Sequence, residues 1–235
     1  MFKYICIKEL KLYFRKPTAF IFFGAFFLAA AFRFIESMLM QSSDIANLFS
    51  QYSGYLWIVI PVLSIGLIPD EKNTNTDRLL ASSSVSACAV VLGKFLASLI
   101  IFTLGLISTL FFSVIFMVTS KPEFMIVLNS YFALFMYGSA ILAMGLFFGA
   151  VVKNVYGGLM ATFGLLVFMN QITMLKMIEN FPKWLEQIVN FFSINDKYHA
   201  FFQAQVSPEP FIYFLSLTVI FLLSAVISVE CKKSN

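Results

Sequence analysis

The stretch LIPDEKNTNTDRLLASSSVSACAVVLGKFLASLI, residues 67–100, decides the fold, because a polar segment interrupts two strongly apolar runs there. Six of its residues carry charge: Asp70, Glu71, Lys72, Asp77, Arg78 and Lys94. Soluble proteins distribute charged residues over the whole surface, whereas these six lie between two apolar segments. The pattern indicates two membrane-crossing helices joined by a short, polar and structured connection.

Composition points in the same direction. Of 235 residues, 60% are hydrophobic and 12% are charged, and the mean hydropathy is +0.88. So few polar groups cannot coat a soluble globule of this length. The chain is therefore predicted to be an all-α integral membrane protein, with the lipid bilayer as one of its partners.

A membrane-spanning helix needs roughly 20 apolar residues to cross the hydrocarbon core. Six stretches satisfy this requirement and predict one transmembrane domain over residues 1–235. The predicted spans are 18–39, 53–69, 95–118, 124–152, 155–175 and 211–229. The connection at 70–94 and the segment at 176–210 lie on opposite sides of the membrane in this arrangement.

The positions of Lys and Arg predict the orientation, because positive residues near helix ends resist translocation. With a cytoplasmic N-terminus, eleven fall inside and four outside, and Arg33 lies within the first span. The inner set is Lys3, Lys8, Lys11, Arg15, Lys16, Lys72, Arg78, Lys94, Lys153, Lys232 and Lys233, and the outer set is Lys121, Lys176, Lys183 and Lys197. An even number of spans also makes the C-terminus cytoplasmic. All three cysteines, Cys6, Cys88 and Cys231, then lie on the reducing side. The net charge of +4 follows from this topology, so nucleic acid is not an expected partner.

Two segments outside the spans are amphipathic. Residues 1–16 place Lys8, Lys11 and Arg15 opposite Phe2, Cys6, Leu10 and Tyr13, which indicates a helix in the membrane interface or a simple basic anchor that ends before Pro17. In the outer segment 176–210, Leu185, Ile188, Val189 and Phe192 recur at helical spacing. That helix either packs on the outer mouth, dips into the leaflet or seals the bundle.

The residue order between the second and third spans suits a turn followed by a short helix. Glu71 and Lys72 precede the turn formers Asn73 to Asn75, and Thr76 is a candidate N-cap for a helix that carries Leu79 and Leu80. A stretch of small residues then leads to Gly93 and Lys94 at the mouth of the third span.

This segment resembles the ABC-2 type permeases of ABC transporters, in the short six-helix form found in bacteria. Aligned without a gap, the matching positions are Glu71, Lys72, Thr76, Leu79, Leu80, Val85, Ser86, Leu92, Gly93, Lys94, Phe95 and Leu96. Asn75, Arg78 and Ser84 depart from the family pattern, which favours Gly, an acid and Pro at these places. Asn tolerates the left-handed backbone that Gly would adopt, whereas Arg78 reverses a charge. The basic start, the outer segment and the closing ECKK also look like the family.

The resemblance implies a coupling element that docks on a separate cytoplasmic ABC ATPase. Leu79 and Leu80 would fill the groove of the partner, and Asp70, Glu71, Lys72, Asp77 and Arg78 would form the charged rim, with Thr76 as the cap. The chain itself has no G-x-x-x-x-G-K-[ST] motif, so it is not expected to be an enzyme. It needs no cofactor of its own, and ATP and Mg would bind to the partner. The expected location is the bacterial plasma membrane.

A few polar residues lie inside the spans. Arg33 and Glu36 are three apart and predict a local ion pair or part of a substrate path. Asn170 and Gln171 are candidates for a pathway or a dimer interface, and Gly145 and Gly149 for close helix packing or a subunit interface. The single histidine, His199, and Asp196 suggest a surface pair more than a metal site.

The predicted function is a permease subunit that exports an amphipathic peptide or a lipid-like molecule. One copy has too few helices to enclose a conduit, so the path would lie between this chain and a second copy or a paralogue. The alternative is a force-transmitting or structural subunit of an ATPase-driven machine through which no solute passes. A membrane-embedded enzyme is disfavoured, since no intramembrane histidine or cluster of acids is present.

Overall fold

The computed structural model describes residues 2–40, 45–64, 86–120, 122–152, 154–177, 182–202 and 208–234. Helices run through these ranges, and no strand occurs in them. The elements are α1 (Phe2–Arg15), α2 (Pro17–Leu39), α3 (Ile45–Val59), α4 (Pro61–Ser64), α7 (Ala87–Ser120), α8 (Phe124–Val151), α9 (Val155–Gln171), η1 (Ile172–Met177), α10 (Lys183–Phe192), α11 (Ile194–His199), η2 (Ala200–Phe202) and α12 (Glu209–Ser234). The all-α prediction is confirmed.

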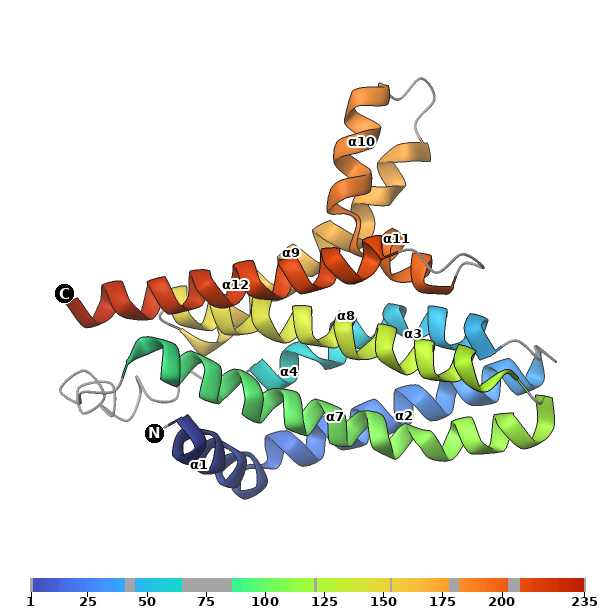
Figure 1. The fold of residues 1–235 in the computed structure, drawn as a ribbon, viewed down its shortest axis with the longest axis horizontal. Helices are drawn as coiled ribbons and strands as arrows, with labels where there is room; N and C mark the ends of the chain where they lie inside the picture. Colours follow the sequence, from blue (N-terminus) through green and yellow to red (C-terminus); the bar gives the residue numbers. More distant parts are fainter. Residues whose placement is uncertain are drawn as a thin grey trace.

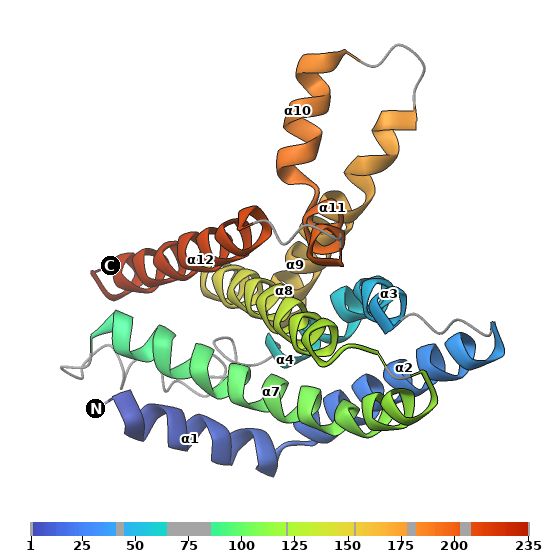
Figure 2. The ribbon, with the colours of Figure 1, turned by 45° about the vertical axis from the view of Figure 1, so that its right-hand side comes forward.

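The long helices lie side by side, and both termini lie at the same end of the bundle (Figure 1). We refer to this end as the termini end and to the opposite end as the far end. Helix α1 lies beside the first half of α7 at the termini end (Figure 2). The predicted break at Pro17 is present: α1 ends at Arg15, and Pro17 occupies the first turn of α2, where its missing N–H costs no hydrogen bond.

Five of the described helices are long and apolar enough to cross a membrane. They are Pro17–Leu39, Ala87–Thr119, Phe124–Val151, Tyr156–Met174 and Glu209–Lys232. The predicted count of six is not confirmed, because the second predicted span, 53–69, has a different local structure. Helix α3 already begins at Ile45 and ends at Val59, and the four-residue α4 follows from Pro61. Proline has no N–H for an intrahelical bond, so the helix breaks before residue 61.

Helix α8 forms the centre of the bundle and is the most buried of the five. It contacts α3, α7, α9 and α12. Small residues make this close packing possible: a Cβ atom on Gly138 would lie 2.2 Å from Cζ of Phe102 in α7. Gly149 packs against α9, because a Cβ atom on Gly158 would lie 3.4 Å from Cα of Gly149. The predicted small-residue contact at Gly149 is therefore made within one chain.

The segment beyond α9 contains two helices of different character. Helix α10, with the predicted amphipathic spacing, packs on η1 and stands out from the side of the bundle (Figures 1 and 2). Trp184 and Phe191 on α10 are exposed. Helix α11 is instead held inside, since Ile194 and Tyr198 are fully buried. The outer segment therefore holds one helix that packs inside the bundle, α11, and one that projects from it, α10.

Candidate transport pathway and coupling surface

The predicted coupling residues lie outside the described residues. These residues are Asp70, Glu71, Lys72, Thr76, Asp77, Arg78, Leu79 and Leu80. The structure describes the helices on either side: α4 ends at Ser64, and α7 begins at Ala87. Residues 87–94, which the sequence assigned to the polar connection, are the first two turns of the spanning helix α7. Helix α7 therefore begins inside the segment 70–94 that the sequence assigned to the connection.

The second of these turns is fixed to α1 by a buried ion pair. Nζ of Lys94 lies 3.3 Å from Oε1 of Glu9, and the two side chains are only 2% and 3% exposed. Removing one partner from a buried pair is strongly destabilising, because the remaining charge loses its compensation in a medium that solvates it poorly. The pair therefore fixes the register of α1 against α7.

A second contact of α1 reaches the other flank of the connection. The Tyr13 hydroxyl donates a 2.6 Å hydrogen bond to the Leu63 carbonyl oxygen in α4. Burial, with a smaller contribution from Glu9, raises the pKa of Tyr13 well above its ordinary value, so the hydroxyl keeps its proton. Helix α1 therefore contacts the last described turn before the connection as well as the first turns after it.

Close backbone packing supports the same contact. A Cβ atom on Gly93 would lie 2.7 Å from Cγ2 of Ile5 and 3.6 Å from the backbone N of Cys6. Only a glycine at residue 93 allows α1 to approach α7 this closely. Cys6 and Tyr13 are buried and Leu10 is half-buried, whereas Lys8, Lys11 and Arg15 are exposed. The face of α1 that holds Cys6, Leu10 and Tyr13 therefore packs on protein.

The sequence analysis did not identify Glu9 as a buried residue, although its position in the helical pattern of residues 1–16 could have indicated it. The residue follows Cys6 by three positions and precedes Tyr13 by four, so it lies on the apolar face. An acid on that face needs a buried cation as its partner. Lys94, assigned to the helix mouth, is that cation, 85 residues away.

At the far end, Arg33 of α2 joins a small polar cluster with α3. Its Nη1 donates to Oε2 of Glu36 and to Oε1 of Gln51, both at 2.7 Å. The guanidinium carbon lies 4.4 Å from the centre of the Tyr55 ring, a cation–π arrangement. The predicted Arg33–Glu36 ion pair is therefore present. Nε is buried without a hydrogen-bond partner among the described residues, which leaves one N–H for a further acceptor.

Asn170 and Gln171 line a cavity of about 420 Å³ between α3 and the end of α9. Its other lining residues include Gly54, Trp57 and Asn195, so both apolar and amide groups line it. A Cβ atom on Gly54 would lie 3.9 Å from Nη2 of Arg33. Gly54 therefore lies beside both the Arg33 cluster and this cavity. The structure thus brings three of the four predicted intramembrane residues to one region, and Glu36 joins them through Arg33.

Buried hydrogen bonds hold α3 in place behind the cavity. The Tyr198 hydroxyl donates to the Phe49 carbonyl oxygen at 2.6 Å, and Ser53 donates to Oδ1 of Asn195 at 3.0 Å. The Tyr137 and Tyr198 rings pack with centroids 4.9 Å apart. Helix α11 therefore fixes one wall of the cavity, which explains why its short sequence is buried.

Metal-binding clusters do not occur in the described part of the chain, where no three His, Cys, Asp or Glu residues gather. His199 is half-buried beside Asp196. Burial lowers the pKa of His199 below its ordinary value, and the Asp196 carboxylate opposes this shift only in part.

These features define a multi-pass membrane protein whose polar connection is attached to a spanning helix and whose far half holds a partly polar cavity. In the comparison with known families, residues 34–229 match the family described as ABC-2 family transporter protein. The match covers most of the chain, and the chain belongs to this family. It is therefore a membrane permease of an ABC transporter. No curated protein matches the sequence.

Proposed function

We propose that the chain exports an amphipathic peptide or a lipid-like molecule, driven by a separate ATPase that docks on the predicted coupling residues, Asp70 to Leu80, in the connection between α4 and α7. The observation that carries this proposal is the attachment of α1 to both flanks of that segment, through Leu63 and Lys94. A docked partner that moves the segment would move α1, α4 and α7 together. A rigid unit of this kind transmits displacement without slack, as coupling requires.

The cavity beside α3 supports an amphipathic substrate. Amide groups of Asn170, Gln171 and Asn195 can bond polar groups, while Trp57, Val167 and Met174 can contact apolar parts. Its volume of about 420 Å³ holds part of a peptide or lipid rather than all of it. A second copy or a paralogue would complete the path.

The projecting helix α10 is consistent with such a pair of subunits. Trp184 and Phe191 are both 64% exposed and lie on a helix that stands away from its own bundle. Exposed aromatic residues are enriched in subunit interfaces. We propose that the termini end faces the cytoplasm, which agrees with the distribution of Lys and Arg and places the exported molecule at the far end.

Co-purification tests the coupling proposal. The tagged chain is extracted from its native membrane in mild detergent, and associated proteins are identified by mass spectrometry. Wild type is compared with the double variant Leu79→Asp and Leu80→Asp, which would place two charges in an apolar docking groove. The matched control, Ser82→Asp with Ser83→Asp, adds the same charges nearby.

We expect wild type and the serine control to recover an ABC ATPase, and the leucine variant to lose it while membrane insertion and helical content stay unchanged. Equal recovery by all three would reject the two leucines as the docking residues. Recovery of no ATPase by any of them would reject the coupling proposal as a whole. Stimulation of the recovered ATPase by candidate solutes then separates export from the force-transmitting alternative.

A further inference from the structure

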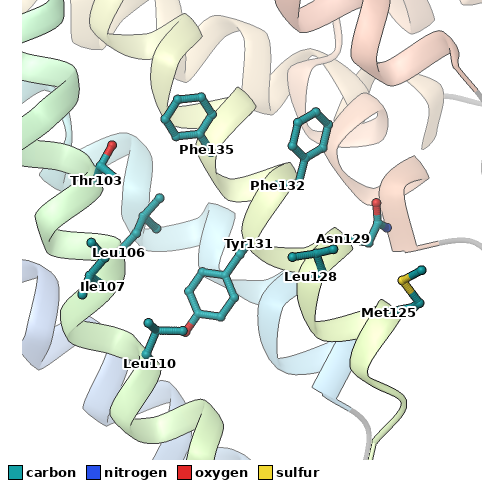
Figure 3. A pocket seen from close by; sticks show the side chains of 10 residues that line it. All are labelled: Thr103, Leu106, Ile107, Leu110, Met125, Leu128, Asn129, Tyr131, Phe132 and Phe135. Carbon is teal, nitrogen blue, oxygen red and sulfur yellow. The ribbon is translucent and has the colours of Figure 1, made fainter.

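A second, larger concavity lies between α7 and α8, away from the cavity at Asn170. Its volume is about 810 Å³. Helix α7 contributes Thr103, Leu106, Ile107 and Leu110, at the spacing of a single helix face, and six residues of α8 between Met125 and Phe135 face them (Figure 3). Both helices are candidate membrane spans, so this groove opens to the bilayer.

The rim of the groove is exposed although its residues are apolar. Ile107 and Leu128 are both 54% exposed, and Met125 is 71% exposed. In water such a rim would be unfavourable, but here the surrounding medium is hydrocarbon. The floor is closed by Tyr131, whose hydroxyl hydrogen-bonds with Ser113 at 2.8 Å and with Thr109 at 3.2 Å. The polar atoms of the floor therefore satisfy one another and leave a dry apolar trough.

The two ends of the groove differ in polarity. At the far end, Asn129 donates its amide to the Phe201 carbonyl oxygen at 2.7 Å, and Phe132 stacks on Phe211, two residues after Glu209 at the start of α12. An amide nitrogen carries two N–H groups, and the bond to Phe201 uses one of them. At the inner end, Thr103 lies near the middle of α7 and Phe135 near the middle of α8. The groove thus begins near the polar boundary and runs into the hydrocarbon.

Its dimensions suit a single hydrocarbon chain. Phe135 lies ten positions after Met125 on α8, a rise of roughly 15 Å along the helix, which is about the hydrocarbon thickness of one leaflet. Apolar side chains from both helices line the groove over this length, so an acyl chain lying in it would contact hydrocarbon groups along its whole course.

We propose that this groove is a binding site for an acyl chain of a membrane phospholipid from the leaflet at the far end. The ester region of the lipid lies at Asn129, and the chain follows the trough toward Phe135. The bound acyl chain fills the groove between α7 and α8. Lys94 lies near the opposite end of α7.

Photolabelling in nanodiscs tests the site. The purified chain is placed in nanodiscs with phosphatidylcholine that carries a diazirine either near the carbonyl or near the end of one acyl chain. After irradiation, labelled peptides are mapped by mass spectrometry. Such nanodiscs contain phospholipid as the sole source of acyl chains, which separates a bilayer lipid from an acylated substrate.

We expect the carbonyl-proximal probe to label residues around Asn129 and the chain-end probe to label residues around Thr103 and Phe135. Ile107→Trp fills the trough and should reduce this labelling several-fold. Ile220→Trp is the matched control, since Ile220 is 57% exposed on α12 and does not line the groove. Leu128→Trp serves the same purpose as Ile107→Trp from the opposite wall.

Three results would overturn the proposal. Labelling of α12 equal to that of the groove would indicate ordinary annular lipid. Labelling of the groove unchanged by either tryptophan variant would exclude the trough as the site. Efficient disulfide formation between two copies with Leu128→Cys, in a chain whose three native cysteines are replaced by serine, would assign the face to a second copy.

Discussion

Glu9 of α1 and Lys94 of α7 are joined by a buried ion pair although 85 residues separate them in the sequence. The pair lies two turns into α7, and Tyr13 of the same α1 helix bonds the last turn of α4. The N-terminal helix is therefore part of the frame that holds the predicted coupling segment. A basic anchor that only fixes orientation would not need a buried acid.

Glu9→Gln removes the negative charge without changing the shape of the side chain. Because Lys94 then loses the compensation that Glu9 provides, we expect the free energy of unfolding in mixed micelles to fall by about 3 kcal/mol. The double variant Glu9→Leu with Lys94→Leu should recover much of this loss, since an apolar pair carries no desolvation cost. Lys11→Gln, at an exposed position of α1, should change it by less than about 0.5 kcal/mol. A Glu9→Gln effect no larger than that of Lys11→Gln would show that the pair does not hold α1 in place.

Gly93→Ala tests the close approach of α1 and α7. The added methyl group would lie 2.7 Å from Cγ2 of Ile5, so the helices must separate. We expect faster hydrogen exchange in residues 2–15 and weaker stimulation of the partner ATPase. Ile5→Ala removes the clashing atom and should restore both in the double variant. The control is Gly24→Ala, where nothing lies within 4 Å and helix propensity alone predicts a gain of roughly 0.5–1 kcal/mol. Equal exchange in the two alanine variants would contradict this prediction.

Local features of this fold were predictable from the sequence. The apolar runs at α2 and α8, the break at Pro17 and the Arg33–Glu36 pair each depend on residues within a few positions of one another. The bend between α3 and α4 could also have been read, because Pro61 interrupts the second apolar run. The early start of α7 at Ala87 was missed because the small residues before Lys94 resemble a loop in composition.

Tertiary partners were not predictable, because nothing in the periodicity of one helix identifies its neighbour. Glu9 reads as an ordinary polar residue until α7 brings Lys94 beside it. The direction of α10 likewise depends on η1, whose residues formed the end of a predicted span. Asn170 and Gln171 were identified as polar residues in an apolar run, but Gly54 and Asn195 became part of the cavity through folding alone.

Gly54→Leu tests the cavity as a substrate path. A leucine would add bulk at a residue that lines the cavity and lies beside Arg33, whereas the Cβ atom alone meets Arg33 at an ordinary 3.9 Å. We therefore expect transport into inverted vesicles to fall about tenfold in Gly54→Leu, a barrier increase of about 1.4 kcal/mol, and to change little in Gly54→Ala. Gly164→Leu on α9, where nothing lies within 4 Å, is the control for added bulk. Transport that is equally fast in both leucine variants would place the path elsewhere.

The lowered pKa of His199 predicts that acid weakens the packing of α11 in the bundle. Because burial disfavours the charged imidazole in the folded protein, the unfolded state binds the proton first as the pH falls through about 6.5. Stability contributed by neutral His199 is therefore fully present above the ordinary pKa and is lost as the pH drops toward the lowered folded value. We expect hydrogen exchange of residues 194–199 to accelerate between about pH 7 and pH 5, with the intrinsic exchange rate corrected at each pH.

His199→Gln keeps a polar side chain of similar size but cannot titrate, so its exchange should be independent of pH over this range. Asp196→Asn is a second variant that tests the cause of the shift, because the Asp196 carboxylate raises the pKa of His199 and so opposes part of the effect of burial. Without that carboxylate the folded pKa should fall further, and the acid-dependent loss should become larger. A pH dependence that persists in His199→Gln would assign the effect to another group at the far end. A loss that becomes smaller in Asp196→Asn would reverse the sign of the interaction deduced from the structure.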